Sequence, residues 1–194
     1  MFDYFNKEKS DFLKKKDKSN KGHIDKGIVK ILNKINSKKD YYTTSSCAGR
    51  IVLLEMKSKK KNECDWIFNK HDKVGFNEIT SSLKKYQQKN KNQQNQIYFK
   101  QQPLILHVAC RNLDAAKKLL DAARKIFKHS GIIGITDKKI TIEIIGSERI
   151  ETIISDKNFV ADEKYVRHLV KYANENFEEN EWKSERLLKT IKTL

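Results

Sequence analysis

The segment Leu104-Ile105-Leu106-His107-Val108-Ala109-Cys110 and the residues that follow it indicate the fold of this chain. Apart from His107 the segment is an apolar run, which is typical of a strand covered on both faces. Apolar residues at helical spacing come next, between Leu113 and Phe127, and Asn112 stands where a helix cap is expected. A strand followed by an amphipathic helix predicts helices packed on a sheet.

More strands and a helix are predicted towards the C-terminus. Residues 132–135 and 140–145 are rich in isoleucine and flank Thr136-Asp137-Lys138-Lys139, a combination typical of a hairpin. A glycine and a serine end the second strand, and residues 149–154 predict another. Apolar residues return to helical spacing within residues 162–192, which predicts C-terminal helices.

The N-terminal half begins with helices. A short leading helix carrying two phenylalanines is followed by a charged break at residues 14–22, and residues 24–35 have the apolar stripe of an amphipathic helix. Residues 51–54 predict a buried strand, and residues 66–68 predict a second, short one. Residues 84–102 are rich in Lys, Gln and Asn, which predicts a mobile loop or a polar helix.

The order of these elements suggests an internal repeat. An amphipathic helix, a serine-containing turn with a glycine and an apolar strand occur twice, in residues 24–54 and 113–145. We therefore predict an α/β (α+β) fold with mixed sheets and packed helices, as a single domain over residues 1–194. Its two similar halves would be a pseudo-repeat of residues 20–100 and 101–160, followed by C-terminal helices in residues 162–192.

The charge of the chain is strongly positive and unevenly spread. Lys and Arg number 41 and Asp and Glu 25, a net charge of +16. Residues 162–194 contain seven basic and seven acidic residues, so the whole excess lies before them. A localised excess of this size favours a polyanionic partner such as nucleic acid. Only six of the basic residues are arginine, however, so many lysines could belong to an ordinary solvated surface.

Composition and missing motifs exclude several classes of protein. The three cysteines, Cys47, Cys64 and Cys110, form no C-x-x-C pair, which excludes a disulfide scaffold or zinc finger and favours a reducing compartment. No apolar run approaches the roughly 18 residues of a membrane span, and no signal peptide is recognisable. P-loop, dinucleotide-binding and H-E-x-x-H motifs are absent. We expect a cytoplasmic protein without a membrane or metal partner.

The segment Ser45-Ser46-Cys47-Ala48-Gly49-Arg50 is the strongest candidate for a binding site. Its small residues allow backbone N–H groups to approach a ligand, and an arginine can bind a carboxylate or phosphate with two parallel hydrogen bonds. The alternative is a polar turn whose serines bond to their own backbone.

Other candidate residues lie at the ends of the predicted strands. His71 and His107 could act as acid–base groups, or could be satisfied core histidines. Arg111 and Arg149 could bind an anion, or form surface ion pairs of little consequence. Trp66 could stack on a substrate, although a core position is the simpler expectation.

Five motifs in this order resemble the tRNA wybutosine-synthesising protein 3 family over nearly the whole chain. They are Ser45–Ile51, Trp66–Asp72, Pro103–Val108, Ser130–Ile132 and Gly146–Glu151. Three departures concern the site: the family usually has a serine at the position of Ala48, a glutamate at that of Gln102 and a proline where this chain has Thr152-Ile153.

The resemblance implies an S-adenosylmethionine-dependent methyltransferase that acts on a wyosine-type tricyclic base beside the anticodon of phenylalanine tRNA. It also implies a fold other than the doubly wound sheet common among methyltransferases. The expected cofactor-binding residues are Ser45, Ser46, Cys47, Gly49 and Arg50. His71 and His107 would be catalytic, and Trp66, Arg111 and Arg149 would bind substrate. The alternative is a non-enzymatic RNA-binding protein; a nuclease is disfavoured because carboxylates do not cluster.

Overall fold

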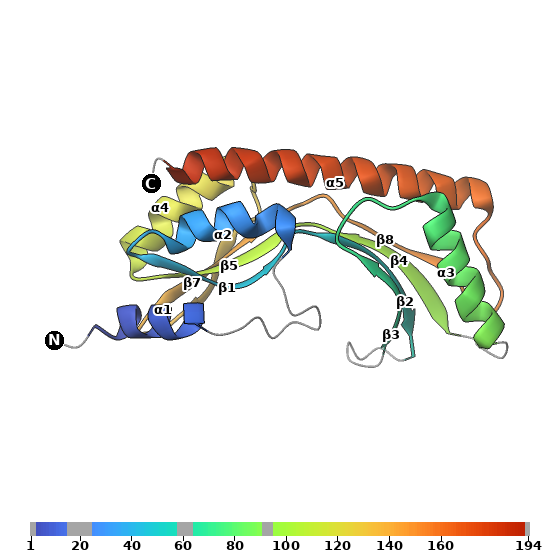
Figure 1. Ribbon diagram of the computed structural model, residues 1–194, viewed down its shortest axis with the longest axis horizontal. Helices are drawn as coiled ribbons and strands as arrows, with labels where there is room; N and C mark the ends of the chain where they lie inside the picture. Colours follow the sequence, from blue (N-terminus) through green and yellow to red (C-terminus); the bar gives the residue numbers. More distant parts are fainter. Residues whose placement is uncertain (1–2, 15–24, 58–63, 91–94, 193–194) are drawn as a thin grey trace. The chain divides into compact units, whose positions relative to one another are not determined.

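A computed structural model describes residues 3–14, 25–57, 64–90 and 95–192 of the chain (Figure 1). These residues form five α-helices and two four-stranded sheets, in which every strand pair is antiparallel. The predicted α+β class is therefore confirmed, and the sheets differ from a doubly wound parallel sheet. The chain divides into two compact units. Unit 1 consists of residues 1–48, 104–147 and 180–194, and unit 2 of residues 49–103 and 148–179.

Unit 1 contains a sheet with the strand order β1-β5-β7-β6. Its elements are α1 (Tyr4–Lys14), the 3₁₀ turn η1 (Lys26–Ile28), α2 (Val29–Asn36), β1 (Tyr41–Cys47), β5 (Ile105–Cys110), α4 (Leu113–Arg124), β6 (Gly131–Ile135) and β7 (Ile140–Ile145). Helices α2 and α4 lie on one face of this sheet and α1 on the other (Figure 1).

The core of unit 1 explains why residues 104–110 form its central strand. Leu106 and Val108 are fully buried against α2 and α4, as are the inward isoleucines of β7. On the opposite face, Ala109 packs with Tyr42 and with Phe5 of α1. The prediction of a strand covered on both faces is thus correct for its second half, whereas His107 is only partly buried.

Unit 2 contains the second sheet, with the strand order β3-β2-β4-β8. Its elements are β2 (Arg50–Met56), β3 (Cys64–Lys70), α3 (Phe76–Lys89), β4 (Gln96–Gln102) and β8 (Ile150–Ser155), together with residues 163–179 of α5 (Glu163–Lys192). Ile51, Leu53 and Phe99 on one face of the sheet pack against α3 and α5. The remaining residues of α5 belong to unit 1, where Leu187 and Ile191 join the core.

Most elements predicted from the sequence are confirmed, one prediction is wrong and another is correct only in part. The helix at residues 113–124 begins as expected, since Asn112 Oδ1 accepts a hydrogen bond from the Ala115 N–H at 2.9 Å. The segment 45–50 is not one turn: residues 45–47 belong to β1 and Arg50 begins β2. Of the two alternatives for residues 84–102, the polar helix is correct as far as Lys89, where α3 ends, whereas residues 96–102 form β4, which pairs with both β2 and β8.

The compact units do not follow the boundaries of the predicted repeat. Residues 20–100 and 101–160 each contribute strands to both sheets, because the chain crosses between units several times. A repeat origin for the two halves stays a prediction. None of the three cysteines, all of which lie in the described ranges, forms a disulfide. Among the described residues, no helix combines the length and apolar character that crossing a membrane requires.

Candidate functional site

His107 stands in a row of polar side chains across the unit 1 sheet. Ser45 of β1 pairs with His107 of β5, which in turn pairs with Glu143 of β7. Directly paired residues of neighbouring strands project from the same face. Ser45, His107 and Glu143 therefore share a face, opposite the one that packs against α2 and α4.

A β-bulge at Thr44 brings Ser45 into this row. Thr43 pairs with Val108, but the next pair is Ser45 with His107, so that Thr44 is the extra residue. Its hydroxyl donates to the His107 carbonyl at 3.4 Å. Without the bulge, Ser45 would pair with Leu106 and project into the core. The same alternation puts Ser46 on the core face and Cys47 on the face of Ser45.

The His107 imidazole and the Glu143 carboxylate form a dyad within unit 1. His107 Nε2 lies 2.9 Å from Glu143 Oε2, and the two side chains are 28% and 27% exposed. A neutral ring that donates its Nε2–H to the carboxylate keeps a lone pair on Nδ1. The carboxylate would also stabilise the imidazolium formed when Nδ1 takes up a proton. The dyad is thus a candidate general base.

Only Ala48 and Gly49 connect β1 to β2, and the boundary between the units falls between them. Gly49 has a φ of 102°, in the left-handed region that favours glycine. The Ala48 N–H donates to Asp25 Oδ2 at 3.0 Å, so this backbone donor of the segment already has a protein acceptor.

Arg50 lies in unit 2 between a neutral amide and an aromatic ring. Its Nε donates to Gln102 Oε1, and its guanidinium carbon lies 4.6 Å from the centre of the Trp66 ring. Within the described ranges no carboxylate pairs with Arg50. Because Gln102 carries no charge, it does not compensate the positive charge of the guanidinium. The terminal N–H groups of Arg50 can therefore donate to an anion.

Trp66 is an exposed residue, contrary to the expectation of a core position. Its exposed fraction is 49%. Leu53 pairs with Phe68 and Leu54 with Trp66, so Ile67 is the extra residue of a second bulge. The bulge moves Trp66 from the core face, which Phe68 occupies, to the opposite face of the sheet.

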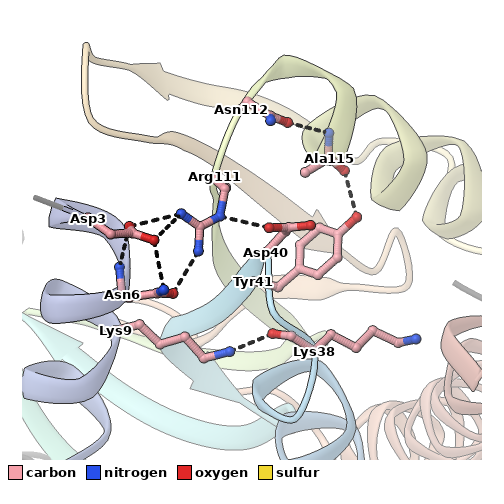
Figure 2. A network of polar contacts seen from close by, with 9 residues as sticks. All are labelled: Asp3, Asn6, Lys9, Lys38, Asp40, Tyr41, Arg111, Asn112 and Ala115. Atoms are coloured by element: carbon pink, nitrogen blue, oxygen red, sulfur yellow. Dashed lines mark hydrogen bonds and ion pairs between the residues drawn. The ribbon is translucent and has the colours of Figure 1, made fainter. Parts of the chain in front are cut away.

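Arg111 is held by three residues of unit 1 (Figure 2). Its Nε donates to Asp40 Oδ1 at 2.7 Å, its Nη1 to Asp3 at 2.9 Å, and its Nη2 to Asn6 Oδ1 at 2.6 Å. The pKa of the Asp3 carboxyl is lowered by hydrogen bonds, first from the Asn6 backbone N–H and then from Arg111. Two carboxylates therefore compensate the charge of Arg111, an arrangement that favours a structural role joining α1 to the sheet.

The other two predicted residues lie in unit 2. His71 follows β3 and is partly exposed, and Arg149 immediately precedes β8 and is exposed. Their catalytic and substrate-binding roles stay predictions. Sequence reasoning missed Glu143, although the alternation Ile140-Thr141-Ile142-Glu143 marks it as an outward residue of a half-buried strand.

A depression lined by lysines lies on unit 1. It measures about 410 Å³ and is shallow. We call it the lysine depression; it is lined by Lys30, Asn33, Lys34, Ser37, Leu188 and Lys192. Unit 1 as a whole has 24 basic and 12 acidic residues, a net charge of +12, whereas unit 2 has 17 and 13, a net charge of +4.

Comparison with known proteins gives concordant matches over the chain. The family model Methyltransferase TYW3 matches residues 7–193. The tRNA(Phe) 7-((3-amino-3-carboxypropyl)-4-demethylwyosine(37)-N(4))-methyltransferase 1 of Pyrococcus horikoshii is 33% identical over 177 residues, 90% of this chain and 87% of that protein. The tRNA wybutosine-synthesizing protein 3 homolog of Danio rerio is 33% identical over 184 residues, 92% of this chain and 70% of that protein.

Among solved structures, that of the PH1069 protein from Pyrococcus horikoshii has a TM-score of 0.84 and 32% identity, covering 96% of this chain and 95% of that chain. Sequence and fold thus agree over almost the whole length, and the resemblance seen in the sequence motifs is confirmed. The chain belongs to the Methyltransferase TYW3 family.

Proposed function

We propose that this protein transfers a methyl group from S-adenosylmethionine to N4 of the 7-(3-amino-3-carboxypropyl)-4-demethylwyosine base at position 37 of tRNA(Phe). The names of relatives at 33% identity support the substrate. Membership of a methyltransferase family makes the protein an enzyme, so the alternative of a non-enzymatic RNA-binding protein is wrong. A cytoplasmic location and independence of metal ions are part of the proposal.

The donor groups of the segment 45–50 are of the kind that would bind the amino-acid end of the cofactor. A carboxylate is the anion that a guanidinium binds best, and Arg50 has no carboxylate partner within the described residues. The exposed Ser45 hydroxyl and the Cys47 thiol project from the same face of β1, and Gly49 supplies a turn without a side chain. Ser46 projects from the other face, so its contribution to binding would be indirect.

For this reaction the protein mainly has to orient the reacting atoms and provide a proton acceptor. When bound, S-adenosylmethionine supplies an electrophilic methyl group on a sulfonium. The new N–C bond forms at N4 as the methyl–sulfur bond breaks, and N4 loses its proton. Holding the reacting atoms in line accounts for much of such an acceleration. His107 Nδ1 would accept the proton while Glu143 holds Nε2–H and stabilises the charged ring.

Two unit 2 residues have supporting roles in the proposal. His71 is a second candidate for orienting the base, and the exposed Trp66 ring offers a stacking surface for a flat tricyclic system. The lysine depression and the other basic residues of unit 1 would bind tRNA phosphates. Arg111 is left out, since Asp3 and Asp40 already pair with it.

The observation that carries the mechanism is the accessible His107–Glu143 dyad beside Ser45. The test is mass analysis of nucleosides from tRNA(Phe) carrying the demethylated base, after incubation with protein and S-adenosylmethionine. We expect a gain of one methyl group on the tricyclic base. No gain, with protein that binds the tRNA normally, would reject the proposed reaction.

A further inference from the structure

One face of the unit 2 sheet is not covered by the helices of that unit. Leu53 and Phe99 point to the helical side and form a buried cluster with α3 and α5. The alternate residues of β2 and β4 point the other way. This open face includes Arg50, Val52, Leu54, Trp66, Tyr98, Lys100 and Gln102, and also Ile153 of β8, which pairs with Tyr98.

The strand register places two aromatic rings in one row of the open face. Leu54 of β2 pairs with Trp66 on one side and with Tyr98 on the other. Two strand spacings separate the backbones of Trp66 and Tyr98, which is about 10 Å. At that separation one base cannot stack on both rings, because Leu54 lies between them and is only 7% exposed. The two rings would therefore contact different bases.

A cation accompanies each ring. Arg50 lies over the Trp66 ring, and Lys100 Nζ lies 4.9 Å from the centre of the Tyr98 ring. Lys100 also pairs with Glu151 at 2.6 Å, at the β8 side of the same face. Rings that stack on bases, next to cations that bind phosphates, are the combination with which sheets bind single-stranded nucleic acid.

The accessible chemistry of the open face favours RNA over a protein partner. Two of its aliphatic residues, Val52 and Leu54, are buried, with 0% and 7% exposed, and Ile153 is partly exposed. Trp66 is 49% exposed, and Arg50, Tyr98, Lys100 and Gln102 are partly exposed. Rings and cations together suit flat bases and phosphates. A protein interface core would instead offer accessible aliphatic surface and fewer charged groups.

We propose that the open face of the unit 2 sheet binds unpaired nucleotides of the tRNA, with one base on Trp66 and a second, different base on Tyr98. Lys100 would exchange its ion pair with the exposed carboxylate of Glu151 for the phosphate beside the second base. This inference rests on the proposed function only in taking tRNA as the partner. It adds Tyr98 and Lys100 to the residues that bind substrate, and it predicts a preference for single-stranded over paired RNA.

Tryptophan fluorescence tests the first contact directly, because the chain has only two tryptophans. The variant Trp182→Phe retains Trp66 alone. A synthetic single-stranded RNA heptamer should quench its fluorescence, since a stacked base contacts the ring. A fully paired RNA hairpin should quench it far less. Equal quenching by the two RNAs would overturn the proposal. No quenching by either RNA would also overturn it, and would favour a protein as the partner of the open face.

Binding of the same heptamer, measured by fluorescence anisotropy without cofactor, tests the second contact. Tyr98→Ala should weaken binding about five- to a hundredfold, the usual range for loss of one stacked base. Tyr98→Phe should bind normally, which separates the role of the ring from that of the hydroxyl bonded to Gln96. Tyr172→Ala, an exposed aromatic on α5, is the control. Unchanged binding by Tyr98→Ala would overturn the second contact, whereas the methyl-transfer assay decides the proposed function independently.

Discussion

Two single-residue bulges determine which side chains can take part in the site. Thr44 in β1 and Ile67 in β3 are each skipped in the cross-strand register. As a result Ser45 joins His107 on one sheet, and Trp66 becomes exposed on the other. Strict alternation would bury both, because a one-residue slip reverses every side chain beyond it. The types of these residues were enough to select them as candidates from the sequence. The face of the sheet from which each side chain projects depends on strand pairing, which no local sequence pattern encodes.

The dyad predicts a graded loss of activity at the residue scale. His107→Ala should lower kcat about a hundredfold or more, the usual contribution of a positioned general base. Glu143→Gln should lower it less, because Nδ1 remains and only the stabilisation of the charged ring is lost. Single-turnover methylation of the tRNA base measures both. Full activity in His107→Ala would contradict its role, and Ser184→Ala, a buried serine of α5, serves as a folding control.

Arg50 predicts a cofactor effect that is separate from RNA binding. Arg50→Ala should weaken S-adenosylmethionine binding roughly tenfold or more in calorimetry, as expected for loss of a charge-assisted hydrogen bond. Gln102→Ala removes the neutral partner of Arg50 while leaving the guanidinium, so its effect should be smaller. Equal cofactor affinity in wild type and Arg50→Ala would reject the assignment.

Two buried groups of unit 1 predict a loss of stability at alkaline pH. Burial raises the pKa of the Cys110 thiol from 9.0 to about 12. Burial, and then the nearby Cys110 and Asp40 charges, raise the pKa of Tyr41 from 10.0 to about 12. The folded state thus favours the protonated forms. The associated stability is complete below pH 9 and is lost as the unfolded chain ionises between pH 9 and 12.

Urea unfolding at a series of pH values measures this effect. Between pH 8 and 10.5 the Cys110 contribution to the free energy of unfolding should fall by about 2 kcal/mol. Cys110→Ala should remove that part of the pH dependence although its stability at pH 8 is also lower. Cys64→Ala, at a partly exposed thiol, should retain it. If the free energy of unfolding of the wild type did not change over this pH range, the fold would not raise the pKa of either group.

Helices and strands were predicted correctly where the sequence shows a clear contrast between apolar and polar residues. Helix α4 and the hairpin β6–β7 combine clear periodicity with cap or turn residues, and both are confirmed. Strand β4 was missed because Gln96, Lys100 and Gln102 conceal its inward residues. Ile97 and Phe99 alternate with these polar residues and are buried, at 3% and 0% exposed. A strand with one open face carries only two or three apolar residues, too few to stand out in a polar segment.

Arg111 makes a prediction about helix α1. Arg111→Ala removes the partner of Asp3 and Asp40 and the cation that lies 4.7 Å from the centre of the Phe5 ring. Amide hydrogens at the start of α1 should then exchange about tenfold faster, since the helix loses one of its polar attachments to the sheet. Lys14→Ala, an exposed position in the last turn of α1, is the control. Unchanged exchange in Arg111→Ala, together with weaker tRNA binding, would instead support the anion-binding role predicted from the sequence.

At the scale of the whole molecule, the division into units could not be predicted from chain order. The chain leaves unit 1 after Ala48 and returns at Leu104, then leaves again after Ser147 and returns at Asn180. Sequence patterns describe neighbours along the chain, whereas long-range strand pairing decides which strands share a sheet. The net charge of a unit depends only on which residues belong to it, and not on how its strands pair. Once the residues of each unit are known, its net charge predicts where polyanions bind.

The charge difference between the units predicts where salt acts on tRNA binding. Each lysine that releases a counterion from a phosphate adds roughly 0.7 to 0.9 to the slope of log affinity against log salt concentration. Lys30 and Lys34 line the lysine depression of the unit with net charge +12. The double variant Lys30→Ala/Lys34→Ala should lower the slope by about 1.4 to 1.8, whichever tRNA is used. The matched variant Lys84→Ala/Lys85→Ala, at exposed positions of α3 in unit 2, should change it much less. Equal changes in the two variants would mean that phosphates contact the basic residues of both units alike, and that the lysine depression has no special part in tRNA binding.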